Sequence, residues 1–72
     1  MHAKVVDVSC FITHIGTKLP KVVKNFVVVF EDDNEQIHKI PVEEDIYDSF
    51  EIGQIGELTL IDGKINSYVL DE

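Results

Sequence analysis

The first apolar pattern along the chain alternates with a period of two from Val5 onward. One parity carries Val6, Val8, Cys10 and Ile12, and the other is mostly polar. This alternation predicts a half-buried β-strand in which Cys10 is a small buried hydrophobic residue and not a nucleophile. The following segment, 16–21, contains a glycine and a proline without periodicity, and it predicts a loop.

The run from Phe26 to Phe30 is continuously β-branched and aromatic. Such a run predicts a central strand that is covered on both faces or curled into a barrel wall. The acidic segment 31–35 fits a hairpin tip, and Gln36 to Val42 predicts a third strand with Ile40 and Val42 on one face. Because Pro41 lacks a backbone N–H, we expect this strand to end at a sheet edge or a bulge.

The segment 43–50 predicts one or two helical turns. Ile46 and Phe50 stand at i and i+4, behind three acids at the positive end of the helix dipole. A β-hairpin follows, with predicted strands from Ile55 to Ile61 and from Lys64 to Leu70. The Asp62-Gly63 pair between them favours a type I′ turn, whose two central residues need positive φ.

These elements predict a mainly β fold in one domain over residues 1–72. We expect a small five-stranded antiparallel sheet forming a partly open barrel, SH3-like or OB-like, with one short helical turn before the fourth strand. The 44% apolar content is typical of a globular chain. A single cysteine cannot form an internal disulfide and suits a reducing compartment. Without an apolar run of about 20 residues, the chain is expected to be cytoplasmic or the soluble part of a membrane-anchored protein.

The charge balance bears on the class of partner. Six basic residues against fourteen acidic ones give a net charge of −8. Such a surface repels nucleic-acid phosphates and anionic lipid headgroups, so contact with nucleic acid or membrane is disfavoured. Lys18, Lys21 and Lys24 are a local exception, because they place three positive charges within seven residues.

The region from Val27 to Tyr68 resembles a known family. It contains Phe30-Glu31, a polar turn, a strand ending in Val42, a helical turn with Tyr47, and Gly53-x-x-Gly56-x-Leu58-Thr59. This pattern is similar to a family of uncharacterised bacterial proteins catalogued as domain of unknown function twenty-five hundred. Its members typically carry an N-terminal membrane helix, which this chain lacks, and tend to have Asp where this chain has Gln54. The resemblance implies a small β domain without assigned activity, and it transfers no site residues.

The candidate metal ligands do not form a recognisable motif. His2, His14 and His38 are scattered, without zinc-site spacing, and we expect strand-end histidines that titrate near their usual pKa. The cluster Asp32, Asp33, Asn34 and Glu35 offers oxygen ligands but lacks the length, glycine and distal glutamate of a calcium loop. We therefore expect a solvated hairpin tip, and we predict no metal and no cofactor.

Other candidate sites have equally ordinary explanations. Glu43 and Glu44 are expected to be acids at a helix start, because nothing in the sequence indicates the burial that an acid–base pair needs. The motif Gly53-Gln54-Ile55-Gly56 matches the Gly-x-x-Gly of KH domains, but it lacks the flanking helices and basic surroundings. Three aromatic residues are candidates for a base-stacking surface and are more often packing residues: Phe11, Tyr47 and Tyr68.

The sequence predicts a non-enzymatic protein-interaction or assembly module. No nucleophile, base and oxyanion donor can be assembled from it, so we predict no catalytic residues. The expected partner is an unidentified protein or a second copy of the chain, bound through a sheet edge or the barrel mouth. The alternative is an OB-type single-stranded nucleic-acid binder that uses Lys18, Lys21 and Lys24 with nearby aromatic residues.

Overall fold

The computed structural model describes residues 1–16, 18 and 21–71. Its elements in chain order are β1 (His2–Ile15), β2 (Lys21–Asp32), β3 (Ile37–Val42), α1 (Glu44–Ser49), β4 (Ile55–Ile61) and β5 (Lys64–Leu70). The strands form one antiparallel sheet in the order β3-β2-β1-β4-β5. The predicted five-stranded, mainly β fold with one short helix is confirmed. Residues 17, 19 and 20 of the predicted loop lie outside the described residues.

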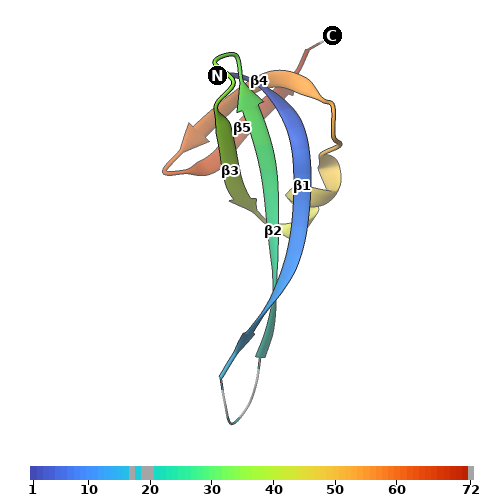
Figure 1. The fold of residues 1–72 in the computed structure, drawn as a ribbon, viewed down its shortest axis with the longest axis vertical. Helices are drawn as coiled ribbons and strands as arrows, with labels where there is room; N and C mark the ends of the chain where they lie inside the picture. Colours follow the sequence, from blue (N-terminus) through green and yellow to red (C-terminus); the bar gives the residue numbers. More distant parts are fainter. Residues whose placement is uncertain (17, 19–20, 72) are drawn as a thin grey trace.

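The sheet curls into a partly open barrel (Figure 1). β1 pairs with both β2 and β4, and the helix lies between β3 and β4. This connectivity is that of an OB-type barrel, one of the two predicted alternatives. The edge strands β3 and β5 run parallel to each other and approach without pairing, so the barrel stays open along this line.

Local sequence signals account for several element boundaries. Asp62 and Gly63 have φ values of 53° and 77°, so the turn between β4 and β5 has the positive φ that its residues predicted. β3 is an edge strand, as Pro41 predicted. The outer side of an edge strand has no neighbour to receive a backbone N–H, so a proline is tolerated there. The residues from Val28 to Phe30 in β2 are buried on both faces, as expected for a non-edge strand.

The core lies between the curled sheet and α1. Its fully buried residues are Ala3, Val5, Val28, Phe30 and Leu58, with Ile40 beside them. Three aromatic rings close the core on the side of the helix. Phe30 meets Phe50 edge-on at a centroid distance of 5.6 Å and Tyr68 at 5.5 Å, and these geometries are favourable for aromatic pairs.

The predicted burial pattern of β1 is wrong in two respects. A β-bulge at Val6 places Val5 opposite Phe30 and Asp7 opposite Val29, so the buried face changes parity. The buried residue before the bulge is therefore Val5, whereas Val8 packs against the core after it. Cys10 was predicted to be buried and is exposed, because β4 pairs with β1 only from His2 to Lys4 and, among the described residues, β2 is the only strand beside β1 at this point.

Candidate interaction surface

β1 and β2 extend together beyond the rest of the molecule (Figure 1). β3 pairs with β2 only from Phe26 onward, and β4 pairs with β1 only from His2 to Lys4. Residues 11–15 of β1 and 21–25 of β2 therefore form a two-stranded ribbon, which we call the arm. The arm gives the molecule its elongated dimensions of 49 × 20 × 19 Å.

The arm exposes apolar side chains on both faces. Cross-strand neighbours share a face, so Thr13 and Val23 lie on the same face as Phe11, while Ile12 lies on the opposite face. Large apolar residues on the arm are between 39% and 57% exposed: Phe11, Ile12, Ile15, Val22 and Val23. A solvent-exposed apolar cluster of this kind commonly marks an interaction surface.

The outer edge of β1 offers unpaired backbone groups. The N–H of Val8 bonds to the carboxylate of Asp7, at 2.9 Å, and not to β2. Successive residues of a strand direct their backbone N–H and C=O groups to opposite sides, so Cys10, Ile12 and His14 direct theirs to the same outer side of β1 as Val8. Among the described residues, no strand pairs with that side of β1 after Lys4. We call residues 9–15 of β1 the free edge.

The other edges carry residues that discourage strand addition. β2 has Lys21 and Lys24 along the arm, β3 has Lys39 and Pro41, and β5 has Lys64. Lysine and proline are the residues with which natural sheets protect their edges. The free edge has none of these, and His14 is its only titratable residue apart from the Cys10 thiol.

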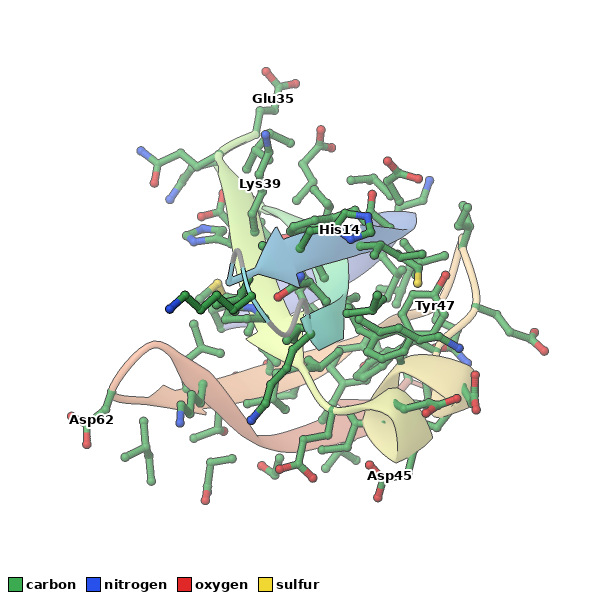
Figure 2. All side chains as sticks on the ribbon, turned by 90° about the horizontal axis from the view of Figure 1, so that it is seen from below. His14, Glu35, Lys39, Asp45, Tyr47 and Asp62 are labelled. Carbon is green, nitrogen blue, oxygen red and sulfur yellow. The ribbon has the colours of Figure 1, made fainter. Side chains whose placement is uncertain are left out.

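Charge is divided between the arm and the body. The sequence from Val8 to Phe30 contains three lysines and no acid, which leaves three lysines and all fourteen acids, a net charge of −11, for the rest of the chain. Figure 2 looks along the arm toward the body, and it shows Glu35, Asp45 and Asp62 pointing outward on different sides. The molecule therefore presents a basic, apolar arm on an acidic body.

Most of this surface was not predicted from the sequence. The alternation in β1 indicated an ordinary half-buried strand, and of the arm residues only Phe11, Lys21 and Lys24 were candidate contacts, for single-stranded nucleic acid. The available signal was the pair of consecutive apolar residues on each strand, Phe11-Ile12 and Val22-Val23, because neighbours in a strand point to opposite faces. A ribbon that is apolar on both faces cannot bury both of them against one compact body.

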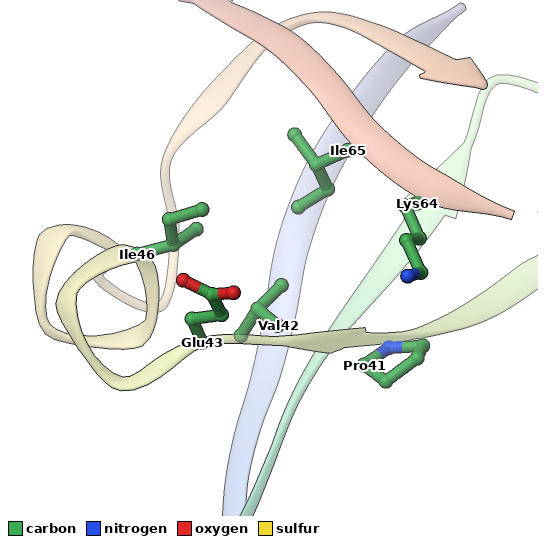
Figure 3. Close-up of a pocket in the computed structure, with 6 residues that line it drawn as sticks. All are labelled: Pro41, Val42, Glu43, Ile46, Lys64 and Ile65. Carbon is green, nitrogen blue, oxygen red and sulfur yellow. The ribbon is translucent and has the colours of Figure 1, made fainter.

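A groove lies where the barrel is open (Figure 3). This groove has a volume of about 430 Å³ and is lined by Pro41, Val42, Glu43, Ile46, Lys64 and Ile65. Its walls come from β3, the start of α1 and the start of β5. Val42 and Ile65 are half-buried and pack against the core, so the groove is largely a shallow continuation of the core.

The three histidines lie in different surroundings. His2 joins the two ends of the chain to the β2–β3 turn, because its Nδ1 donates to Asp33 at 2.9 Å and its Nε2 donates to Asp71 at 2.7 Å. These hydrogen bonds, to Asp33 first and then to Asp71, raise the pKa of His2 from 6.5 to about 9. The expected ordinary titration of His2 is therefore wrong. His38 donates to Asp32, and His14 is exposed on the arm.

The acidic hairpin tip is only partly solvated. Asn34 and Glu35 are exposed as expected, but the side chain of Asp32 is only 12% exposed. Its Oδ1 accepts the backbone N–H groups of Asn34 and Gln36, and its Oδ2 accepts from His38 at 2.8 Å. The bond from His38 first, and then the backbone N–H of Gln36, lower the pKa of Asp32. Asp32 thus closes the turn instead of offering oxygens to a cation.

The candidate base-stacking residues are not brought together. Tyr47 packs on Phe26 with a centroid distance of 5.0 Å, and the Tyr68 hydroxyl donates to the carbonyl of Ala3 at 3.1 Å. Phe11 lies apart from both, on the arm. Among the described residues, no three His, Cys, Asp or Glu side chains gather as metal ligands would. The predicted absence of a metal stays a prediction.

The glycine motif and the paired glutamates have structural roles. Gly53 donates its N–H to the Val5 carbonyl at 2.8 Å, and Gln54 accepts from the Val5 N–H at 2.9 Å, which ties the chain to β1 beside the bulge. The motif follows α1 and runs into β4, so it is not flanked by two helices. Glu43 is the N-cap residue of α1, Glu44 lies in its first turn, and both are exposed, as predicted.

Comparison of the chain with models of protein families, with curated proteins and with solved structures gave no match. The resemblance to the family of uncharacterised bacterial domains therefore stays a prediction. Within the part of the chain that the structure describes, no helix has the length and apolar character needed to cross a membrane.

Proposed function

We propose that this protein is a non-enzymatic interaction or assembly module that binds another polypeptide strand along the arm. The observation that carries the proposal is the arm itself, in which exposed apolar residues on both faces adjoin the unpaired free edge of β1. The cytoplasm, or the soluble side of an anchored protein, suits the exposed thiol of Cys10.

The physical argument is that the arm lacks the support a ribbon ordinarily has. Two strands alone are marginally stable in water, because each side chain can pack on few neighbours. A third strand added along the free edge supplies backbone partners and, through its alternating side chains, apolar cover on both faces. A bilayer covers the faces but supplies no partners for edge N–H and C=O groups, so lipid fits this surface less well.

The test is affinity capture with three forms of the tagged protein, followed by binding measurements with each purified partner. Phe11→Lys places a charge beside the free edge, where its cross-strand neighbour Asn25 is neutral. Val23→Lys makes the same charge change on the same face but on β2, so it is the matched control. We expect a polypeptide that binds the wild type and Val23→Lys but not Phe11→Lys. Equal binding to all three forms would refute the role of the arm.

A second candidate function is single-stranded nucleic-acid binding. It is favoured by the OB-type connectivity and by Lys18, Lys21 and Lys24, which have no acid near them in the sequence. Anisotropy titration of a labelled oligonucleotide should then show affinity that falls steeply with salt and is lost when Lys21 and Lys24 are replaced by Glu. Phe11→Lys adds a positive charge and should not weaken this binding, which separates it from the first proposal. A flat titration at low salt excludes it.

A further inference from the structure

We infer that the strand received by the free edge is the free edge of a second copy of this chain, so that two arms pair antiparallel into a four-stranded ribbon. This inference rests on the proposed function, since it names the partner of the same surface. The resulting dimer has a two-fold axis across residues 9–15, and both subunits contribute the same segment.

The composition of the free edge permits pairing with itself. Residues 9–15 are Ser, Cys, Phe, Ile, Thr, His and Ile, without a lysine, acid or proline. Two identical strands of this kind lie side by side without like charges facing each other, which would be destabilising. The β-branched and aromatic residues Phe11, Ile12, Thr13 and Ile15 favour cross-strand contacts. Seven residues extend over roughly 24 Å, which is longer than an average strand.

Charge favours the antiparallel arrangement. In an antiparallel overlap each arm runs toward the base of the other, so Lys18 and Lys21 of one copy approach the body of its partner, while Lys24, which pairs with Ile12, lies near the two-fold axis. That body has a net charge of −11, whereas the segment with the lysines has no acid. A parallel arrangement would instead place the two sets of lysines together and the two acidic bodies together. Opposite charges thus select one relative orientation of the two copies.

The directions of the backbone N–H groups predict which amides become hydrogen-bonded in the dimer. The N–H groups of Cys10, Ile12 and His14 face the outer side of β1, while those of Phe11 and Thr13 face β2. In the dimer the first set becomes hydrogen-bonded to the second copy. Packing of two arms face to face would bury the apolar residues of one face only and leave these three N–H groups exposed to water.

The experiment measures the mass of the untagged protein by sedimentation over a wide concentration range, for the wild type, Phe11→Lys and Val23→Lys. We expect a concentration-dependent dimer for the wild type and for Val23→Lys, and a monomer for Phe11→Lys with an unchanged circular dichroism spectrum. Amide exchange by NMR should show Cys10, Ile12 and His14 slowed at high concentration only, and Phe11 and Thr13 slowed at every concentration.

Any other result contradicts either self-pairing or the use of the free edge. A wild type that is monomeric throughout refutes self-pairing, and the proposed function then depends only on whether a different polypeptide distinguishes Phe11→Lys from Val23→Lys. A dimer that survives Phe11→Lys, or one that Val23→Lys also dissociates, refutes pairing through the free edge. Fast exchange of Cys10, Ile12 and His14 in a dimer shows that the two copies meet by another surface.

Discussion

Phe30 is the side chain whose removal should most weaken this fold. It is 0% exposed and lies near the end of β2, between β1 and β3. Its ring contacts those of Phe50 and Tyr68, which also contact each other at 5.3 Å. Replacing Phe30 with alanine removes the central ring of this group and leaves a cavity at the place where the sheet and the residue after α1 meet.

The size of the effect follows from burial and from the ability of the site to collapse. Truncation of a buried phenylalanine to alanine typically costs about 3 to 5 kcal/mol. Phe50 and Tyr68 are only half-buried, so they can move into part of the space, and we expect a loss near the lower value of roughly 3 kcal/mol. A domain of this length has a total stability of roughly 4 to 11 kcal/mol, so the variant should be partly unfolded at ambient temperature if the wild type is near the lower limit.

The measurement is equilibrium denaturation in urea, monitored by circular dichroism, with Glu35→Ala as the control. Glu35 is exposed at the β2–β3 turn, and its backbone N–H bonds to the Asp32 carbonyl whatever its side chain. We expect Glu35→Ala to change the free energy of unfolding by less than about 0.5 kcal/mol. If the two variants lose the same stability, the packing of Phe30 does not control the fold and the assignment of the core is wrong.

Three further substitutions or conditions test other parts of the structure. Gly56→Ala should lower the melting temperature, at a cost of roughly 1 to 3 kcal/mol, because a Cβ there would overlap the facing carbonyl of β5; an unchanged melting temperature would contradict the close approach of β4 and β5. His2 has a pKa raised to about 9, so its contribution to stability is complete below pH 6.5 and is lost as the pH rises toward 9. The stability difference between wild type and His2→Ala should therefore shrink over that interval. A constant difference would contradict the stabilising role of the His2 bonds to Asp33 and Asp71. Asp32 has a lowered pKa, so its contribution is present above pH 3.8 and disappears as the pH falls below it; an Asp32→Asn variant with the same acid denaturation profile as the wild type would contradict this.

The sequence predicted the elements whose signals are local. Asp62 and Gly63 specify their turn because positive φ is accessible to few residues, and the flanking strands then begin and end where predicted. Pro41 predicted a sheet edge because it has no N–H to donate, and β3 is indeed an edge strand. In each case the backbone chemistry of one or two residues is sufficient.

The structure decided what depends on distant neighbours. The alternation in β1 predicted a buried Cys10, but burial requires something to pack against, and β4 pairs with β1 only as far as Lys4. The bulge at Val6 is visible only in the register with β2. Likewise, the sequence separates His2 from Asp33 and Asp71, and only the curled sheet brings them within hydrogen-bond distance.

The candidate interaction surface also depends partly on local sequence and partly on tertiary structure. Its residue types, and the absence of acids from Val8 to Phe30, can be read directly from the sequence. That no strand within the described part of the chain lies beside the free edge of β1, while β3 and β4 pair elsewhere, depends on strand order and strand length together. Periodicity along one strand reports which side chains share a face, but it contains no information on which other strand lies beside it. Local sequence therefore determined the strands and turns of this protein, and tertiary pairing determined which of its edges stays open.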